Sequence, residues 1–168
     1  SVTLGLCAIS EVIINAENIL SNEKREVLKH RVFIKLKEII YSFWSIIRGG
    51  FIGFIIGVLP GAGAGIASFV SYSTERQISK NPENFGKGEI KGVAGPESAN
   101  NAASAGAFVP MLALGVPGSA TTAVMLGAFL MLDIQAGPML FLERPDVVWG
   151  LVAALYVGNI FLLILNLP

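Results

Sequence analysis

Residues 49–74 read GGFIGFIIGVLPGAGAGIASFVSYST and contain no charged side chain. A membrane-spanning helix needs about 20 predominantly apolar residues, so this window is long enough to cross a bilayer. Two further windows, 98–132 and 147–168, are also free of charge. Three such windows predict an all-α integral membrane protein with transmembrane helices.

The composition agrees with a chain that lies in a lipid bilayer. Hydrophobic residues make up 53% and charged residues 14%, whereas soluble domains carry about 25% charged residues. The 12 Lys and Arg balance the 12 Asp and Glu, so no basic field attracts nucleic acid. With one Cys, one His and no phosphate-loop, dinucleotide or nucleophile-elbow motif, we predict no catalysis, no organic cofactor and no zinc site.

The first window is interrupted at its centre by Pro60, Gly61, Ala62 and Gly63. Proline removes a backbone donor, and glycine weakens the continuity of a helix. The window therefore predicts either a broken helix or a re-entrant hairpin whose two ends lie on the same face of the membrane. Glycines also recur every fourth residue, a spacing that lets two helix backbones approach closely. These glycines are Gly53, Gly57, Gly61 and Gly65.

The second window carries a related interruption. As one helix, residues 98–132 would be about 52 Å long, more than the roughly 30 Å of a bilayer core. Pro110 or Pro117 should therefore break this helix within the membrane. The polar and small residues after the break can cap a second helix or bind a ligand. They are Gly118, Ser119, Thr121 and Thr122.

Charge and proline placement divide the chain into segments. Basic residues and apolar residues at helical spacing in 21–48 predict an amphipathic helix on the cytoplasmic side, with a plain linker helix as the alternative. The predicted order is the end of a preceding membrane segment (1–20), this basic helix (21–48), the Gly-rich broken helix or hairpin (49–74), a polar loop (75–97), broken membrane helices (98–132), an outer loop (133–146) and a transmembrane helix (147–168).

Paired helix breaks point to a binding site. In transporters, half-helix N-termini hold anionic substrates and unwound carbonyls hold coupling cations. Between the breaks lie Glu97, Asn100 and Asn101, and asparagines are costly inside a membrane unless they bind something. Two alternatives stay open: Pro96 and Glu97 begin a helix and stabilise its N-terminus, or the breaks are packing kinks without a ligand.

Four stretches carry a family resemblance. They are GVLPGAGAGIASFVSY (57–72), NPENFGKGEIKGVAGPESANNAA (81–103), LGVPGSATTAVMLGA (114–128) and GPMLFLERPDVVWGLVAALYVGN (137–159). Their order and spacing resemble the large membrane subunit of tripartite tricarboxylate transporters, the TctA family, at the start of its second half. The chain departs from that pattern at Gly65, Gly95 and Ser98.

The resemblance implies part of a larger inverted-repeat transporter, multi-pass in the bacterial inner membrane. It would import citrate-like di- or tricarboxylates by symport with Na⁺ or H⁺. A periplasmic solute-binding protein and a small membrane subunit would be its partners. A channel or a membrane scaffold without a substrate is the alternative. Carried over, the substrate-binding residues would be Pro60, Gly61, Ala62, Gly63, Asn100, Asn101, Pro117, Gly118, Ser119, Thr121 and Thr122, with Glu97 and Asn101 as ion-coupling candidates.

Overall fold

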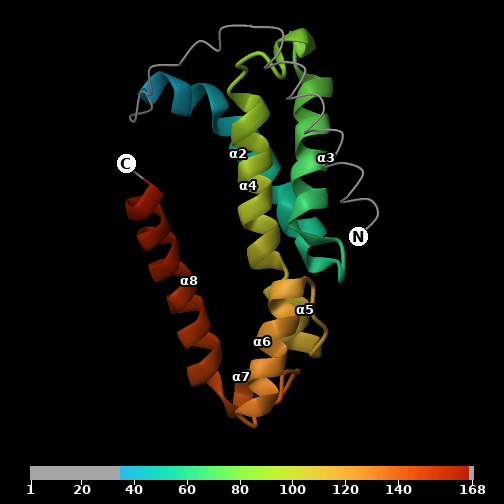
Figure 1. The fold of residues 1–168 in the computed structure, drawn as a ribbon, viewed down its shortest axis with the longest axis vertical. Coiled ribbons are helices and arrows are strands. Elements are labelled where there is room, and N and C mark those ends of the chain that lie inside the picture. Colours follow the sequence, from blue (N-terminus) through green and yellow to red (C-terminus); the bar gives the residue numbers. More distant parts are fainter. Residues whose placement is uncertain (1–34, 167–168) are drawn as a thin grey trace, which may run out of the picture. The chain divides into compact units, whose positions relative to one another are not determined.

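A computed structural model describes residues 35–166, and every regular element in this range is a helix (Figure 1). The all-α prediction is thus confirmed for the described range, whereas segment 1–20 and residues 21–34 of the basic segment lie outside it. In chain order the elements are α2 (Leu36–Val58), α3 (Gly63–Ile78), the 3₁₀ turn η1 (Pro82–Asn84), α4 (Lys91–Gly106), α5 (Phe108–Leu114), α6 (Ala120–Met131), α7 (Leu140–Glu143) and α8 (Pro145–Asn166).

Helix α2 joins two predicted segments into one element. Its first turn is capped because the Lys35 backbone N–H donates to the Glu38 carboxylate at 2.8 Å. From there it runs without a break through Arg48 to Val58, so the end of the basic segment and the start of the Gly-rich window form a single helix. Helix α2 and residues Pro145–Leu165 of α8 are both long and apolar enough to cross a membrane.

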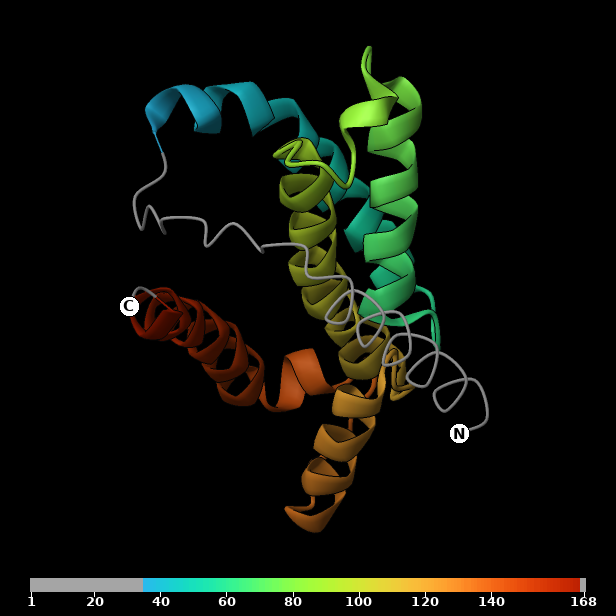
Figure 2. The same ribbon diagram turned by 45° about the horizontal axis from the view of Figure 1, so that its top comes forward.

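Helices α2, α3 and α4 pack pairwise against one another (Figures 1 and 2). The buried face of α2 contains only serine and glycine, and it lies on the small-residue face of α4. A Cβ built on Gly53 would lie 2.6 Å from the Ala99 Cα, too close for any side chain. The four-residue glycine spacing is therefore used for close backbone contact. The facing pairs are Gly49 with Gly95, Gly53 with Ala99, and Gly57 with Ala103.

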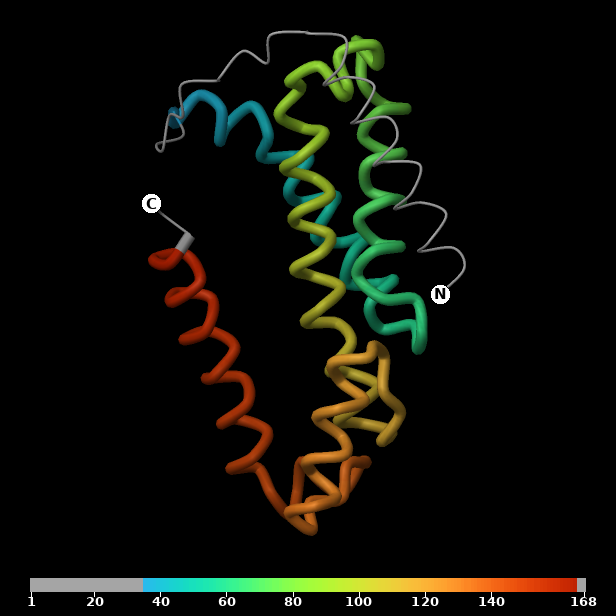
Figure 3. The backbone as a smooth tube through the Cα atoms, in the orientation of Figure 1, coloured from blue at the N-terminus to red at the C-terminus, as the bar shows by residue number. Residues whose placement is uncertain are grey.

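The chain reverses direction after α2 and returns along it as α3 (Figure 3). The reversal occupies Leu59–Ala62, so the interruption predicted at Pro60 is present. An ion pair between Arg48 of α2 and Glu75 of α3 ties the two helices together far from this turn. The structure contains a helical hairpin at residues 49–74. Whether that hairpin re-enters the membrane remains a prediction.

Several boundaries differ from those expected. Residues 75–97 form helix at both ends, because α3 continues to Ile78 and α4 begins at Lys91. Pro96 lies inside α4, where its carbonyl accepts a hydrogen bond from Ser68 Oγ at 3.2 Å. The alternative in which Pro96 and Glu97 begin a helix is therefore wrong. Residues 91–95, which precede Pro96, extend the helix by more than a turn.

The window 98–132 is broken twice. Helix α4 ends at Gly106 and α5 follows after Ala107; α5 then ends at Leu114, and α6 begins after Ser119. Pro117 therefore lies in an interruption, as predicted, whereas Pro110 is accommodated within α5. This part of the chain has its own apolar core, built from α5, α6, α7 and the start of α8. Its buried members are Met111, Leu112, Phe129, Ile134, Leu140 and Val148.

Helix α8 begins at Pro145, which fits the first helical position because its missing N–H has no partner there anyway. Most of its side chains are exposed, including Trp149 and Tyr156. The small residues Gly150 and Gly158 suggest a close helix partner. However, a Cβ at either position would meet nothing within 4 Å among the described residues. In a membrane protein, lipid or other protein covers such an apolar surface.

Candidate functional site

The first helix break is shaped by two glycines. Gly61 has a φ of 84° and Gly63 a φ of 71°, left-handed conformations that other L-residues rarely adopt. Helix α3 starts at Gly63, and its N-cap residue, Ala62, offers no side chain to cap it. The N–H groups of the first turn of α3 are therefore not satisfied by a side-chain cap, and they carry the positive end of the helix dipole.

The second break is shaped by a left-handed glycine and a capping box. Gly115, with a φ of 68°, ends α5. Ser119 then begins α6: its Oγ accepts from the Thr122 backbone N–H at 3.2 Å, and Thr122 Oγ1 accepts from the Ser119 backbone N–H at 2.8 Å. Thr122 is buried, whereas Thr121 is exposed. Ser119 and Thr122 thus cap the helix, and the exposed Thr121 takes no part in the cap.

The two breaks contact each other. The Gly61 N–H donates to the Gly118 carbonyl oxygen at 3.2 Å, although 57 residues separate the two. Gly118 also lies against the joint between α4 and α5, since a Cβ at Gly118 would lie 3.0 Å from the Ala107 Cα. Three interruptions of helical structure therefore meet at one place, which we call the break junction: Leu59–Ala62, Ala107 and Gly115–Ser119.

A cavity of about 330 Å³ opens beside the break junction. Ala64 from the first turn of α3 contributes one wall, and Ser119 to Thr122 at the start of α6 contribute another. The cavity thus lies at the N-terminal ends of two helices, where backbone N–H groups and dipoles favour an anion. Among residues 35–166, no Lys, Arg, Asp or Glu lines it. The lining residues are Ala64, Ala103, Ser104, Phe108, Ser119, Ala120, Thr121 and Thr122.

Only part of the predicted substrate set lies on this cavity. Ser119, Thr121 and Thr122 line it, and Gly61 and Gly118 form the hydrogen bond of the break junction next to it. Pro60, Ala62, Gly63 and Pro117 belong to the interruptions themselves.

The predicted polar residues of α4 lie elsewhere. Asn101 is exposed, and its Nδ2 donates to the Glu97 carbonyl oxygen at 2.9 Å. The backbone carbonyl oxygen of Asn100 accepts a hydrogen bond from Ser104 Oγ at 2.9 Å. Glu97, Asn100 and Asn101 are not among the residues that line the cavity. A role for them in binding stays a prediction.

Sequence reasoning missed Ser104, the one polar residue that α4 contributes to the cavity. The available signal was its position, one helical turn after Asn100 and Asn101. The sequence gives no sign of the apolar residues that line the cavity, because an alanine that lines a cavity cannot be distinguished in sequence from one that packs against another helix. These residues are Ala64, Ala103, Phe108 and Ala120.

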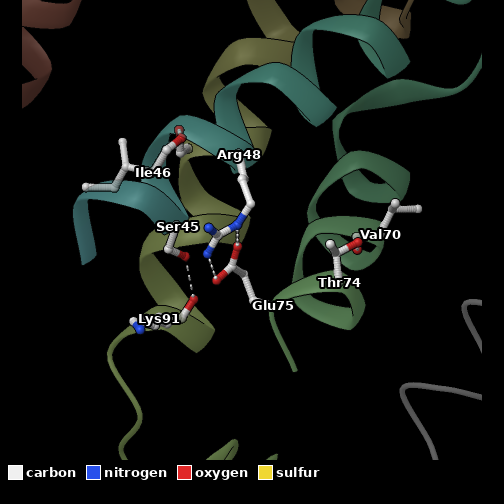
Figure 4. Close-up of polar contacts among 8 residues, drawn as sticks. Ser45, Ile46, Arg48, Val70, Thr74, Glu75 and Lys91 are labelled. Carbon is white, nitrogen blue, oxygen red and sulfur yellow. Dashed lines mark hydrogen bonds and ion pairs between the residues drawn. The ribbon is translucent and has the colours of Figure 1, made fainter. Parts of the chain in front are cut away.

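A second polar cluster lies between α2, α3 and α4 (Figure 4). Arg48 Nε donates to Glu75 Oε1 at 2.8 Å and Nη2 donates to Oε2 at 2.9 Å, a bidentate pair. The Glu75 side chain is 1% exposed and that of Arg48 38% exposed. The sequence did not predict this pair. Arg48 is the last residue of the basic segment and Glu75 the first of the polar loop, and in both places a charged side chain is expected to face water.

The model of the family described as "Tripartite tricarboxylate transporter TctA family" matches residues 1–168 of this chain. The chain belongs to the TctA family. This is a transporter family and not an enzyme family. With α2 and α8 as candidate membrane spans, membership makes the chain part of a membrane protein.

Two curated proteins similar to this chain come from Agrobacterium vitis. An uncharacterized 52.8 kDa protein in the TAR-I ttuC′ 3′ region is 42% identical over 171 residues, covering 100% of this chain and 34% of the relative. An uncharacterized protein in the TAR-II ttuC′ 3′ region is 51% identical over 116 residues, covering 69% of this chain and 48% of the relative. The chain thus spans about a third and about half of these relatives. No solved structure matches it.

Proposed function

We propose that this chain carries the substrate site of a secondary transporter subunit for di- or tricarboxylates, and that the site is the cavity beside the break junction. The observation that carries the proposal is the meeting of the two Pro–Gly breaks, with the N-termini of α3 and α6 lining one cavity. Broken helices of this kind form the substrate sites of many transporters.

The chemistry of the cavity favours a carboxylate that is held and released. Backbone N–H groups, the Thr121 hydroxyl and two helix dipoles would bind the carboxylate oxygens. No Lys or Arg of the described part of the chain lines the cavity, so the ligand forms no strong ion pair there that would slow its release. A volume of about 330 Å³ lies at the small end of ligand pockets, which suits a compact metabolite.

The electrical cost of import calls for a coupling cation. Moving one charge against 100 mV costs about 2.3 kcal/mol, so a trianion that enters a negative cell costs roughly 7 kcal/mol. Symport with Na⁺ or H⁺ offsets this cost. In the proposed assembly, a periplasmic solute-binding protein delivers the carboxylate, and a small membrane subunit completes the multi-pass complex in the bacterial inner membrane.

The test is uptake and binding of labelled citrate and tartrate by the full chain in sealed proteoliposomes, with its binding protein and small subunit. Thr121→Ala should weaken binding without loss of folding, because the Thr121 side chain is exposed and caps nothing. Thr74→Ala is the matched control, since Thr74 is a threonine of α3 that does not line the cavity.

Three results would contradict the proposal. Uptake that persists after ion gradients collapse would exclude secondary transport. Unitary conductance would indicate a channel. The absence of carboxylate binding in the intact complex would indicate that this subunit is a scaffold without a substrate site.

A further inference from the structure

The polar cluster of α2, α3 and α4 contains a hydroxyl that its surroundings do not satisfy. Ser71 is fully buried, and its Oγ has no hydrogen-bond partner among the described residues. Other buried serines of this region do find acceptors; Ser42 Oγ, for example, donates to the Glu38 carbonyl oxygen at 2.7 Å. A buried polar atom without a partner is rare and requires an explanation, such as an ion or water bound there.

Three oxygen-bearing side chains from two helices, Ser45, Ser71 and Glu75, surround the Cα of Gly95. A Cβ built on Gly95 would lie 2.7 Å from Ser45 Oγ, 2.9 Å from Glu75 Cγ and 3.3 Å from Ser71 Oγ. Ser71 and Glu75 are one turn apart on α3, so their side chains share a face. Ser45 and Glu75 are also buried. The glycine at position 95 thus leaves room for these side chains to approach one another.

The Glu75 carboxylate retains capacity to bind a second group. Arg48 makes one hydrogen bond to each carboxylate oxygen, and each oxygen has a further lone pair. Ser45 Oγ makes only a long hydrogen bond, 3.4 Å, to the Lys91 carbonyl oxygen (Figure 4). The cluster therefore offers two hydroxyls that are weakly engaged or not engaged, beside a carboxylate that Arg48 pairs but whose further lone pairs stay open.

We infer that Glu75, Ser71 and Ser45 form a binding site for a small alkali cation such as Na⁺. Oxygen atoms are the ligands of hard cations, and a single carboxylate suits a monovalent ion. The site's role as the coupling site rests on the proposed transport function, whereas cation binding itself is independent of transport.

The site links a cation to the helical hairpin. Arg48 and the cation are both positive and share one buried carboxylate, so they repel each other and compete. Cation binding therefore weakens the ion pair that holds α3 to α2. The same two helices meet at their other end in the Leu59–Ala62 turn of the break junction. A cation at Glu75 thus changes the packing of the hairpin that lines the substrate cavity.

The test is thermal unfolding of the purified full chain in detergent, followed by tryptophan fluorescence, with NaCl replaced by choline chloride at constant ionic strength. Na⁺ should raise the unfolding midpoint in a saturable way. Ser71→Ala should raise the half-saturating Na⁺ concentration by about tenfold or more, the usual effect of weakening an ion's ligand set. Because the Ser71 hydroxyl has no partner to lose, the variant should remain folded in choline.

Two further variants sharpen the test. Ser73→Ala is the matched control on the same helix and should leave the Na⁺ response unchanged. Arg48→Gln should lower the half-saturating Na⁺ concentration, because it removes the competing cation. The inference is overturned if Na⁺ has no saturable effect, if Ser71→Ala responds as the parent does, or if the midpoint follows pH in choline and ignores Na⁺.

This outcome is separable from that of the proposed function. The Na⁺ response is measured without carboxylate. Loss of carboxylate binding in Thr121→Ala, with an intact Na⁺ response, would support the substrate site alone. The reverse result would support the cation site alone.

Discussion

Gly53→Ala probes the contact between α2 and α4, on which the position of the break junction depends. The new Cβ would lie 2.6 Å from the Ala99 Cα, well short of the 3.4 Å at which ordinary van der Waals contact begins. The opposing atoms are the carbonyl oxygen, Cα and carbonyl carbon of Ala99, all backbone atoms, so no rotamer change relieves the clash. The two helices must separate, and the neighbouring contacts at Gly49 and Gly57 are lost with them.

The expected cost follows from two opposing terms. Overpacking a tight interior costs about 1–3 kcal/mol, and replacing glycine by alanine inside a helix returns up to about 1 kcal/mol. Because the contact is with backbone, the first term should lie in its upper half. We expect the free energy of unfolding to fall by about 1–2 kcal/mol.

The matched control is Gly127→Ala in α6, where a Cβ would meet nothing within 4 Å. Only the helix-propensity term acts there, so stability should stay level or rise by up to about 1 kcal/mol. The assay is unfolding of the full chain in detergent, together with labelled citrate binding. Gly53→Ala should lower both stability and affinity. If both variants shift stability in the same direction, the close-contact reasoning is refuted.

Gly61→Ala should lower the free energy of unfolding by about 1–2 kcal/mol, because Gly61 is left-handed with a φ of 84°. Gly65→Ala should not lower it, because Gly65 has an ordinary φ and a Cβ there would meet nothing within 4 Å. Thermal unfolding of both variants measures the difference. Breaking a buried ion pair lowers the free energy of unfolding by about 3–5 kcal/mol. Since the Arg48 side chain is 38% exposed, we expect Arg48→Met to lower it by about 2–3 kcal/mol. Most of that stability should return in the double variant Arg48→Met/Glu75→Leu, and a double variant less stable than the single one would contradict this. Ser119→Ala should cost about 1 kcal/mol through the lost α6 cap. Ser119→Asp should keep that cap but weaken citrate binding by charge repulsion; unchanged citrate affinity would place the carboxylate elsewhere.

The Asn pair shows why the site could be predicted only in part. On α4 the buried face comprises Gly95, Ala99, Ala103 and Gly106. Successive residues are rotated by about 100°, so Asn101 points away from Ala99 and is exposed. The sequence places two costly carboxamides in a membrane window, but their direction depends on which face of α4 packs on α2. That choice is made by the close fit of Gly53 to Ala99.

The class of the protein and the break at Pro60 follow from the sequence alone, whereas the sequence left Pro110 or Pro117 open as the second break and did not predict the joint at Ala107. Uncharged windows are a property of composition, Pro60 lacks a backbone donor whatever its surroundings, and Gly61 can adopt a left-handed φ without steric cost. Which residues each break contacts is decided by the tertiary structure. The Gly61 to Gly118 hydrogen bond, the cavity at two helix N-termini and the ion pair between Arg48 and Glu75 all join residues far apart in the chain. Only helix packing brings such residues together, because local preferences carry no information about distant contacts.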